Sequence, residues 1–141
     1  MKVIMSKQIY MQLFKLPQIA PYELGGFLGK REVICKFQLD FNTQQEKGSY
    51  NPNHLLFYKT ISVWRKNGIQ FCGIMHTHTE NQNGISKEDE KFITAIMNEN
   101  KRIFDDMLHF PIVIPQKEII MFSAFWEKGH VKIKQSEIKL V

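Results

Sequence analysis

The chain lacks any hydrophobic run that approaches the ~20 residues of a membrane-spanning helix, although 43% of its 141 residues are hydrophobic. Its first residues, MKVIMSKQIYMQLFKLPQ, are interrupted by lysines and are not followed by a small-residue cleavage site, so no signal peptide is predicted. These absences favour a cytoplasmic protein without a membrane partner. The length suits one domain over residues 1–141 with its own hydrophobic core.

Cysteine is scarce, since Cys35 and Cys72 are the only two in the chain. Their spacing is not that of paired metal ligands, and each lies in an apolar run typical of a strand. A thiol in such a run usually stays reduced in the cytoplasm. We therefore predict buried free thiols in preference to a disulfide, which remains the alternative.

An extreme charge is also absent, because the formal net charge is only +5. Part of this excess comes from lysines that alternate with apolar residues near the C-terminus, as they would on a solvated strand face. The alternative is a basic surface for an acidic partner or nucleic acid. The chain lacks the interleaved basic and aromatic residues of nucleic-acid grooves, so we do not expect nucleic acid as a partner.

Hydrophobic periodicity divides the chain into short strands and helices. Apolar residues three and four apart predict helices that begin at Ser6, Pro52 and Ser86. Alternating or continuous apolar runs predict strands at residues 2–5, 24–29, 32–41, 69–75, 110–114, 118–126 and 131–138. The resulting order, β-α-β-β-α-β-α-β-β-β, predicts an α/β fold in which helices wrap a mixed β-sheet.

Two histidines, a serine and an aspartate stand close together in the segment GIMHTHTENQNGISKEDEKF. His76 and His78 follow a predicted strand, and side chains two apart on a strand point to one face. Ser86 and Asp89 are one helical turn apart, which returns both side chains to one side. Two imidazoles and one carboxylate are the three protein ligands that a catalytic zinc needs if its fourth position stays open.

Each of these residues also has a purely structural interpretation. Ser86 and Asp89 match a capping box at a helix N-terminus, and two histidines on a strand are often only hydrogen-bonded polar residues. Glu23, in PYELGGFLGK, would by itself be a solvated acid. The joint occurrence of these residues in this order favours one Zn²⁺ per chain, held by His76, His78 and Asp89.

The combined pattern resembles the JAMM metallopeptidase family, also called MPN+ or JAB. The family signature is a glutamate in an E-x-x-G-x-L-like segment, followed by His-x-His and then Ser-x-x-Asp. This chain carries it at Glu23, Gly26, Leu28, His76, His78, Ser86 and Asp89. One departure is Thr79, which stands where the family usually has a loop-stiffening proline that is not a ligand. The resemblance implies the JAB/MPN (cytidine-deaminase-like) architecture, again a mixed sheet wrapped by helices.

The resemblance further implies a zinc-dependent peptidase or isopeptidase. Glu23 would take a proton from water and give it to the leaving amine, and Ser86 would donate a hydrogen bond to the oxyanion. The substrate would be a protein, cleaved at the glycine-rich C-terminal tail of a ubiquitin-like or sulfur-carrier-type protein. The alternatives are a JAB-fold scaffold or interaction domain without turnover, and a protein associated with DNA repair or defence.

Overall fold

The computed structural model describes residues 1–19, 22–40, 50–78, 84–101 and 107–141. Thr79, which replaces the expected proline, lies outside these ranges. None of the described helices is both long enough and apolar enough to cross a membrane.

The order of helices and strands matches the predicted order. The described elements are β1 (Lys2–Met5), α1 (Lys7–Phe14), β2 (Gly25–Lys30), β3 (Ile34–Asp40), α2 (His54–Lys66), β4 (Gln70–Thr77), α3 (Lys87–Glu99), β5 (Met107–Ile114), β6 (Glu118–Glu127) and β7 (His130–Leu140). The histidine strand extends further than its apolar run, so His76 belongs to β4 itself.

Side-chain caps fix where the helices begin. Ser6 caps α1 by accepting a hydrogen bond of 3.2 Å from the backbone N–H three residues later, as its position predicted. The predicted start of α2 at Pro52 was wrong by two residues. Asn53 is the cap of that helix and accepts from the Leu56 N–H at 3.2 Å.

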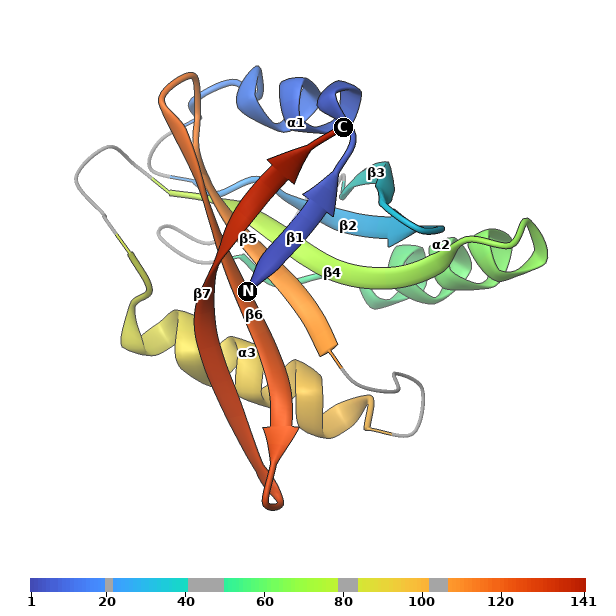
Figure 1. Ribbon diagram of the computed structural model, residues 1–141, viewed down its shortest axis with the longest axis vertical. Helices are drawn as coiled ribbons and strands as arrows, with labels where there is room; N and C mark the ends of the chain where they lie inside the picture. Colours follow the sequence, from blue (N-terminus) through green and yellow to red (C-terminus); the bar gives the residue numbers. More distant parts are fainter. Residues whose placement is uncertain (20–21, 41–49, 79–83, 102–106) are drawn as a thin grey trace.

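The predicted fold class was wrong. The strands do not form a mixed sheet wrapped by helices, as in the JAB/MPN architecture, but a closed barrel in the order β1-β3-β2-β4-β5-β6-β7 (Figure 1). The barrel is closed by β1, which pairs in parallel with β7 along its length and meets β3 at Met5↔Ile34. Hydrophobic periodicity indicates which face of a strand is buried but not which distant strand pairs with it. The closure of the barrel therefore could not be predicted from local sequence patterns.

One apolar cluster fills the inside of the barrel. It joins Met5, Leu28, Met75 and Val113 from different strands to Leu13 of α1. Helix α1 contacts β3, β5 and β6. Because β3 and β5 are not neighbours in the barrel, α1 must lie across one of its ends, which is the upper end in Figure 1.

A second apolar cluster holds the other two helices against the outer face of the barrel. It includes Phe57 of α2, Ile93 of α3, and Phe27, Ile74 and Phe110 from three adjacent strands. Helix α2 contacts β2 and β4, whereas α3 contacts β6 and β7. In the strand order, β5 therefore lies between the strands that α2 contacts and those that α3 contacts (Figure 1).

Three neighbouring strands place one row of residues beside this outer cluster. Gly25 of β2 pairs with Asp40 of β3 on one side and with His76 of β4 on the other. Side chains paired across neighbouring strands point to the same face, and His76 is two residues from Ile74 of the outer cluster. Because Gly25 has no side chain, the row leaves a gap between Asp40 and His76 on the outer face.

Candidate metal centre

Three side chains converge where the end of β4 meets the start of α3. The Nε2 atoms of His76 and His78 are 2.9 Å apart, and Asp89 Oδ1 lies 3.0 Å from His76 Nε2. The other carboxylate oxygen of Asp89 lies 3.1 Å from His78 Nε2. The three residues are only 2%, 3% and 8% exposed, so the predicted ligands meet at one buried point.

No assignment of protons to the two imidazole rings makes all the short contacts in this cluster favourable. If both Nε2 atoms carry protons for Asp89, two N–H groups face each other across 2.9 Å. If one of them is deprotonated, its lone pair faces a carboxylate oxygen 3.0 or 3.1 Å away. A shared cation removes both conflicts. Ligand atoms ~2.0–2.2 Å from a tetrahedral zinc lie roughly 3.3–3.5 Å apart, so a bound zinc would spread the observed contacts of 2.9–3.1 Å by a few tenths of an ångström.

The first turn of α3 holds Asp89 in place. Ser86 Oγ accepts from the Asp89 N–H at 3.1 Å, and Asp89 Oδ2 accepts from the Ser86 N–H at 3.1 Å, which completes a capping box. Burial acts to raise the pKa of Asp89, but the hydrogen bonds from His76 and His78 outweigh it and hold the pKa well below its usual range. Asp89 is therefore charged, as a metal ligand has to be.

Backbone contacts and packing orient the two histidines. His78 lies just past the end of β4, and its N–H donates to the carbonyl of Val113 in β5 at 2.9 Å. The His76 ring meets Phe92 of α3 edge-on, with ring centroids 6.3 Å apart. The buried Nδ1 of His76 has no hydrogen-bond partner among the residues that the structure describes, so this ring is oriented by packing and by the contact of its Nε2 with Asp89.

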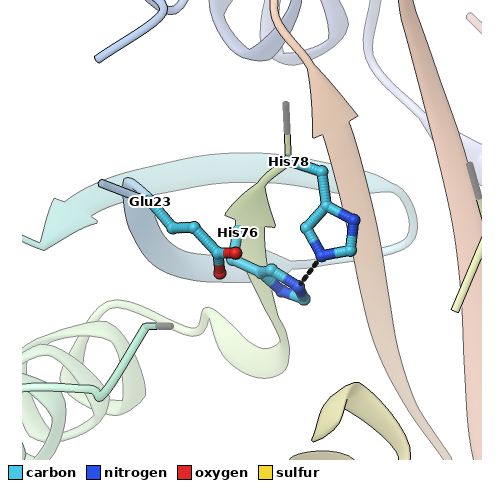
Figure 2. A group of neighbouring side chains, drawn as sticks. All are labelled: Glu23, His76 and His78. Atoms are coloured by element: carbon cyan, nitrogen blue, oxygen red, sulfur yellow. Dashed lines mark hydrogen bonds between the residues drawn. The ribbon is translucent and has the colours of Figure 1, made fainter. Parts of the chain in front are cut away.

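Glu23 lies beside the histidines despite its distance from them in sequence (Figure 2). Its segment is tied to β4 by Thr77, whose Oγ1 accepts from the Leu24 N–H at 2.8 Å and whose N–H donates to the Leu24 carbonyl at 2.9 Å. Burial raises the pKa of Glu23, an effect that His76 and His78 partly offset. A raised pKa suits a carboxyl group that accepts and returns a proton near neutral pH.

Two possible ligand sets share the histidines. Donor atoms of Glu23, His76 and His78 all lie within 4.8 Å of one another, whereas the contacts in the set that contains Asp89 are 2.9–3.1 Å. A single small ion is better matched by the tighter set. The contacts of Asp89 with both histidines are the reason to treat it as the third candidate ligand and Glu23 as the neighbouring carboxyl group.

A cavity of about 470 Å³ opens over these side chains. The sequence-predicted site residues all line it, namely Glu23, His76, His78, Ser86 and Asp89. Ser86 is exposed to the cavity, and its Oγ acts as the acceptor in the bond from Asp89 N. The hydroxyl proton of Ser86 therefore remains available for donation to a ligand.

Sequence reasoning missed Tyr50, which also lines the cavity. Its ring fills the gap above Gly25, since a Cβ added there would lie 2.1 Å from a ring carbon. The Tyr50 hydroxyl donates to Asp40 Oδ2 at 2.7 Å, and the same oxygen accepts from the Asn53 N–H at 2.9 Å. Burial raises the pKa of Tyr50, so the hydroxyl stays protonated. A glycine inside a strand can mark such close approach, but it does not say which residue approaches.

The cysteines lie away from this centre. Both are free thiols, as predicted, but only Cys72 is fully buried and Cys35 is half-buried. Burial raises the pKa of Cys72 to about 12, so this thiol is not a thiolate nucleophile at neutral pH.

The comparisons with known proteins bear on the fold alone. No family model matches the chain, and no curated protein matches it. Among solved structures, the solution structure of a protein from Desulfitobacterium hafniense, a structural-genomics target, is similar to it with a TM-score of 0.65. The alignment covers 100% of this chain and 93% of the other at 21% identity. The likeness therefore supports the chain fold and carries no function across.

Proposed function

We propose that this protein is a zinc-dependent peptidase or isopeptidase whose site residues act as the JAMM resemblance implies. One observation supports it most strongly: the imidazole nitrogens of His76 and His78 and the Asp89 carboxylate converge within 2.9–3.1 Å of one another, with Glu23 buried beside them. The proposal concerns the chemistry of this site and not the JAB/MPN fold, which the barrel replaces.

In this proposal His76, His78 and Asp89 hold one Zn²⁺. Two neutral imidazoles and one carboxylate leave the bound ion with net positive charge, and zinc in such a site supplies a Lewis acid that polarises a carbonyl and makes water more acidic. The cavity above the three ligands leaves room for the scissile amide. The surrounding protein keeps the ligands buried and therefore fixed in orientation.

Glu23 is the proton carrier in the proposed reaction. Its carboxylate accepts a proton from a water molecule in the cavity and later gives it to the leaving amine. The raised pKa of Glu23 favours the second step, because a carboxyl group with a pKa closer to neutral holds the proton long enough to deliver it. Thr77 positions this segment through its two hydrogen bonds to Leu24.

Ser86 stabilises charge on the substrate in the same reaction. Its Oγ is occupied as an acceptor by the Asp89 N–H, so its own proton can point into the cavity. A hydroxyl donor aimed at a developing oxyanion contributes electrostatic stabilisation. No described residue is hydrogen-bonded to Ser86 Oγ in the manner of a general base, which makes nucleophilic attack by Ser86 a poor alternative.

The substrate class rests on the motif resemblance. We propose a protein substrate cleaved at a glycine-rich C-terminal tail of the ubiquitin-like or sulfur-carrier type, with the enzyme in the cytoplasm. The intact Glu23 and the complete ligand set speak against a scaffold without turnover, since a scaffold needs neither.

The first test is the metal content of the purified protein. We expect about one zinc per chain by elemental analysis in the wild type, and loss of this zinc in both His76→Ala and Asp89→Ala. His130→Ala is the matched control, because His130 is exposed on β7 and lies outside the cavity. A wild-type protein that takes up no zinc even after reconstitution would refute the proposal.

Glu23→Gln separates the proton carrier from the ligands. This variant should bind as much zinc as the wild type, because Glu23 is outside the tight ligand set, and it should lose hydrolytic activity. If Glu23→Gln loses zinc as completely as Asp89→Ala does, then Glu23 is itself a ligand and its proposed role is wrong.

A further inference from the structure

The cavity over the candidate metal centre shares part of its lining with a second hollow on the surface of α3. A second, shallow hollow of about 580 Å³ is lined by Lys87, Glu90, Lys91, Thr94, Ala95 and Asn98. Two of these residues, Lys91 and Ala95, also line the cavity over the metal centre. The two hollows therefore meet at Lys91 and Ala95.

The lining residues of the second hollow form one stripe along the helix. They fall into two adjacent rows, Lys87, Lys91 and Ala95 beside Glu90, Thr94 and Asn98, with members four positions apart in each row, which is the spacing of neighbours on one helical face. From Lys87 to Asn98 the stripe is about 16 Å long at ~1.5 Å per residue. An extended peptide covers that length with about five residues at ~3.3 Å each. We call this surface the α3 stripe.

Tyr50 forms one wall of the cavity over the candidate metal centre. The Tyr50 ring occupies the space above Gly25, where even a methyl group would lie 2.1 Å from it. Asp40 fixes the ring through the 2.7 Å bond from the Tyr50 hydroxyl, and the ring meets Phe92 at a centroid distance of 6.3 Å. A chain that reaches the metal therefore ends against Tyr50 or turns there, and cannot continue in that direction across β2 and β3.

We propose that the substrate is an extended polypeptide segment that lies along the α3 stripe and enters the metal cavity past Ala95. This inference rests on the proposed function, because it assigns the path by which a scissile amide reaches the centre. Ala95, which has the smallest side chain among the residues that line the second hollow, borders both hollows.

The chemistry of the α3 stripe suits a peptide backbone with polar side chains. Thr94 and Asn98 offer hydroxyl and amide groups that can both donate and accept hydrogen bonds. Lys87 and Lys91 alternate with Glu90, so the stripe has no excess of one charge large enough to select a polyanion. Lys91 and Glu88 hold each other only loosely, at 4.0 Å and with both side chains largely exposed, so Lys91 can turn to a ligand at the junction.

Hydroxamate-tipped peptides test this path without requiring turnover. The probes are acetohydroxamate, a hexapeptide (Ser-Ala)₃ with a C-terminal hydroxamate, and the same hexapeptide joined at its N-terminus to a malonyl hydroxamate. The two peptides place the chain on opposite sides of the chelating group. The readout is the ratio of the acetohydroxamate Kd to the peptide Kd for zinc-loaded protein, measured by calorimetry. A substitution that changes how the hydroxamate group binds the zinc alters both Kd values by the same factor, so this effect cancels in the ratio.

In the wild type, at least one of the two peptides should bind about tenfold or more tightly than acetohydroxamate. Ala95→Trp blocks the junction, and Asn98→Trp covers the stripe beyond the metal cavity, so both should remove this gain. Lys59→Trp, an exposed position on α2 outside both hollows, is the matched control and should keep it.

A wild type that shows no gain with either peptide, or a gain that survives Asn98→Trp, would overturn the inference and leave the proposed function standing. Failure of acetohydroxamate to bind zinc-loaded wild type would instead sink the proposed open metal centre, and the substrate path with it.

Discussion

Protonation of a buried histidine away from the metal centre should make the barrel sensitive to mild acid. His109 of β5 is 8% exposed, and its Nδ1 is 2.8 Å from Ser123 Oγ, which in turn is 2.8 Å from Ser136 Oγ. The three residues form a polar chain across β5, β6 and β7. Burial, with a contribution from the positive charge of Lys30, lowers the pKa of His109 from 6.5 to about 4.

The direction of the effect follows from which state binds the proton. As the pH falls from about 6.5 to about 4, the unfolded chain protonates this histidine while the folded chain keeps it neutral. The free energy of unfolding therefore decreases through that window and is fully recovered above it. One pKa unit corresponds to ~1.36 kcal/mol. The expected loss from this residue is about 2 kcal/mol at pH 5 and about 3 kcal/mol at pH 4.

The assay is urea unfolding of the zinc-free protein between pH 4 and pH 7.5, in the wild type and in His109→Asn. Asparagine keeps a polar atom near the position of Nδ1 and does not titrate. The difference between the two proteins in the free energy of unfolding reports His109 alone, because both proteins contain the same acids and histidines at the candidate metal centre. If the wild type and His109→Asn lose stability in parallel as the pH falls, the lowered pKa of His109 is wrong.

Two further substitutions test the local geometry of the site. Gly25→Ala places a Cβ 2.1 Å from the Tyr50 ring, so we expect a loss of about 1–3 kcal/mol in the free energy of unfolding by urea. Combining it with Tyr50→Ala should remove the clash, and additive losses in the double variant would contradict the contact. Ser86→Ala removes the capping box of α3 and should cost about 1 kcal/mol in the same assay, whereas Ser86→Thr should keep most of the cap. Wild-type stability in Ser86→Ala would show that the cap contributes nothing.

Local sequence patterns were sufficient to predict the helices and strands but not to predict how these elements are arranged in space. The order of helices and strands was predicted correctly because periodicity and caps act over a few residues; Ser6 and Ser86 cap their helices as expected. The closed barrel was not predicted, because it depends on Lys2 pairing with Glu137 and Met5 pairing with Leu140. Such pairings are selected by the packing of the whole core, and α1 covers the end of the barrel for the same reason.

Some residues of the candidate site could likewise be predicted from the sequence, and others could not. Strand alternation predicted that His76 and His78 share a face, whereas Asp89 was grouped with them through the order of the residues and the motif resemblance. Tyr50 could not be predicted, since its place depends on a gap at Gly25 and an acceptor on Asp40, each on a different strand. The position of Glu23 beside the histidines could be anticipated only through the motif resemblance, because it depends on the bonds between Leu24 and Thr77.

The pairing of β1 with β7 also bears on how the protein is made. During synthesis, residues 2–5 emerge long before their partners at 137–140, so the barrel cannot close until almost the whole of this chain has left the ribosome. The candidate ligands His76, His78 and Asp89 emerge much earlier than residues 137–140. Closing a loop that spans nearly the entire chain carries a large entropic cost and slows folding. Until the ends meet, the apolar inner faces of the strands stay exposed, and such surfaces are prone to aggregation.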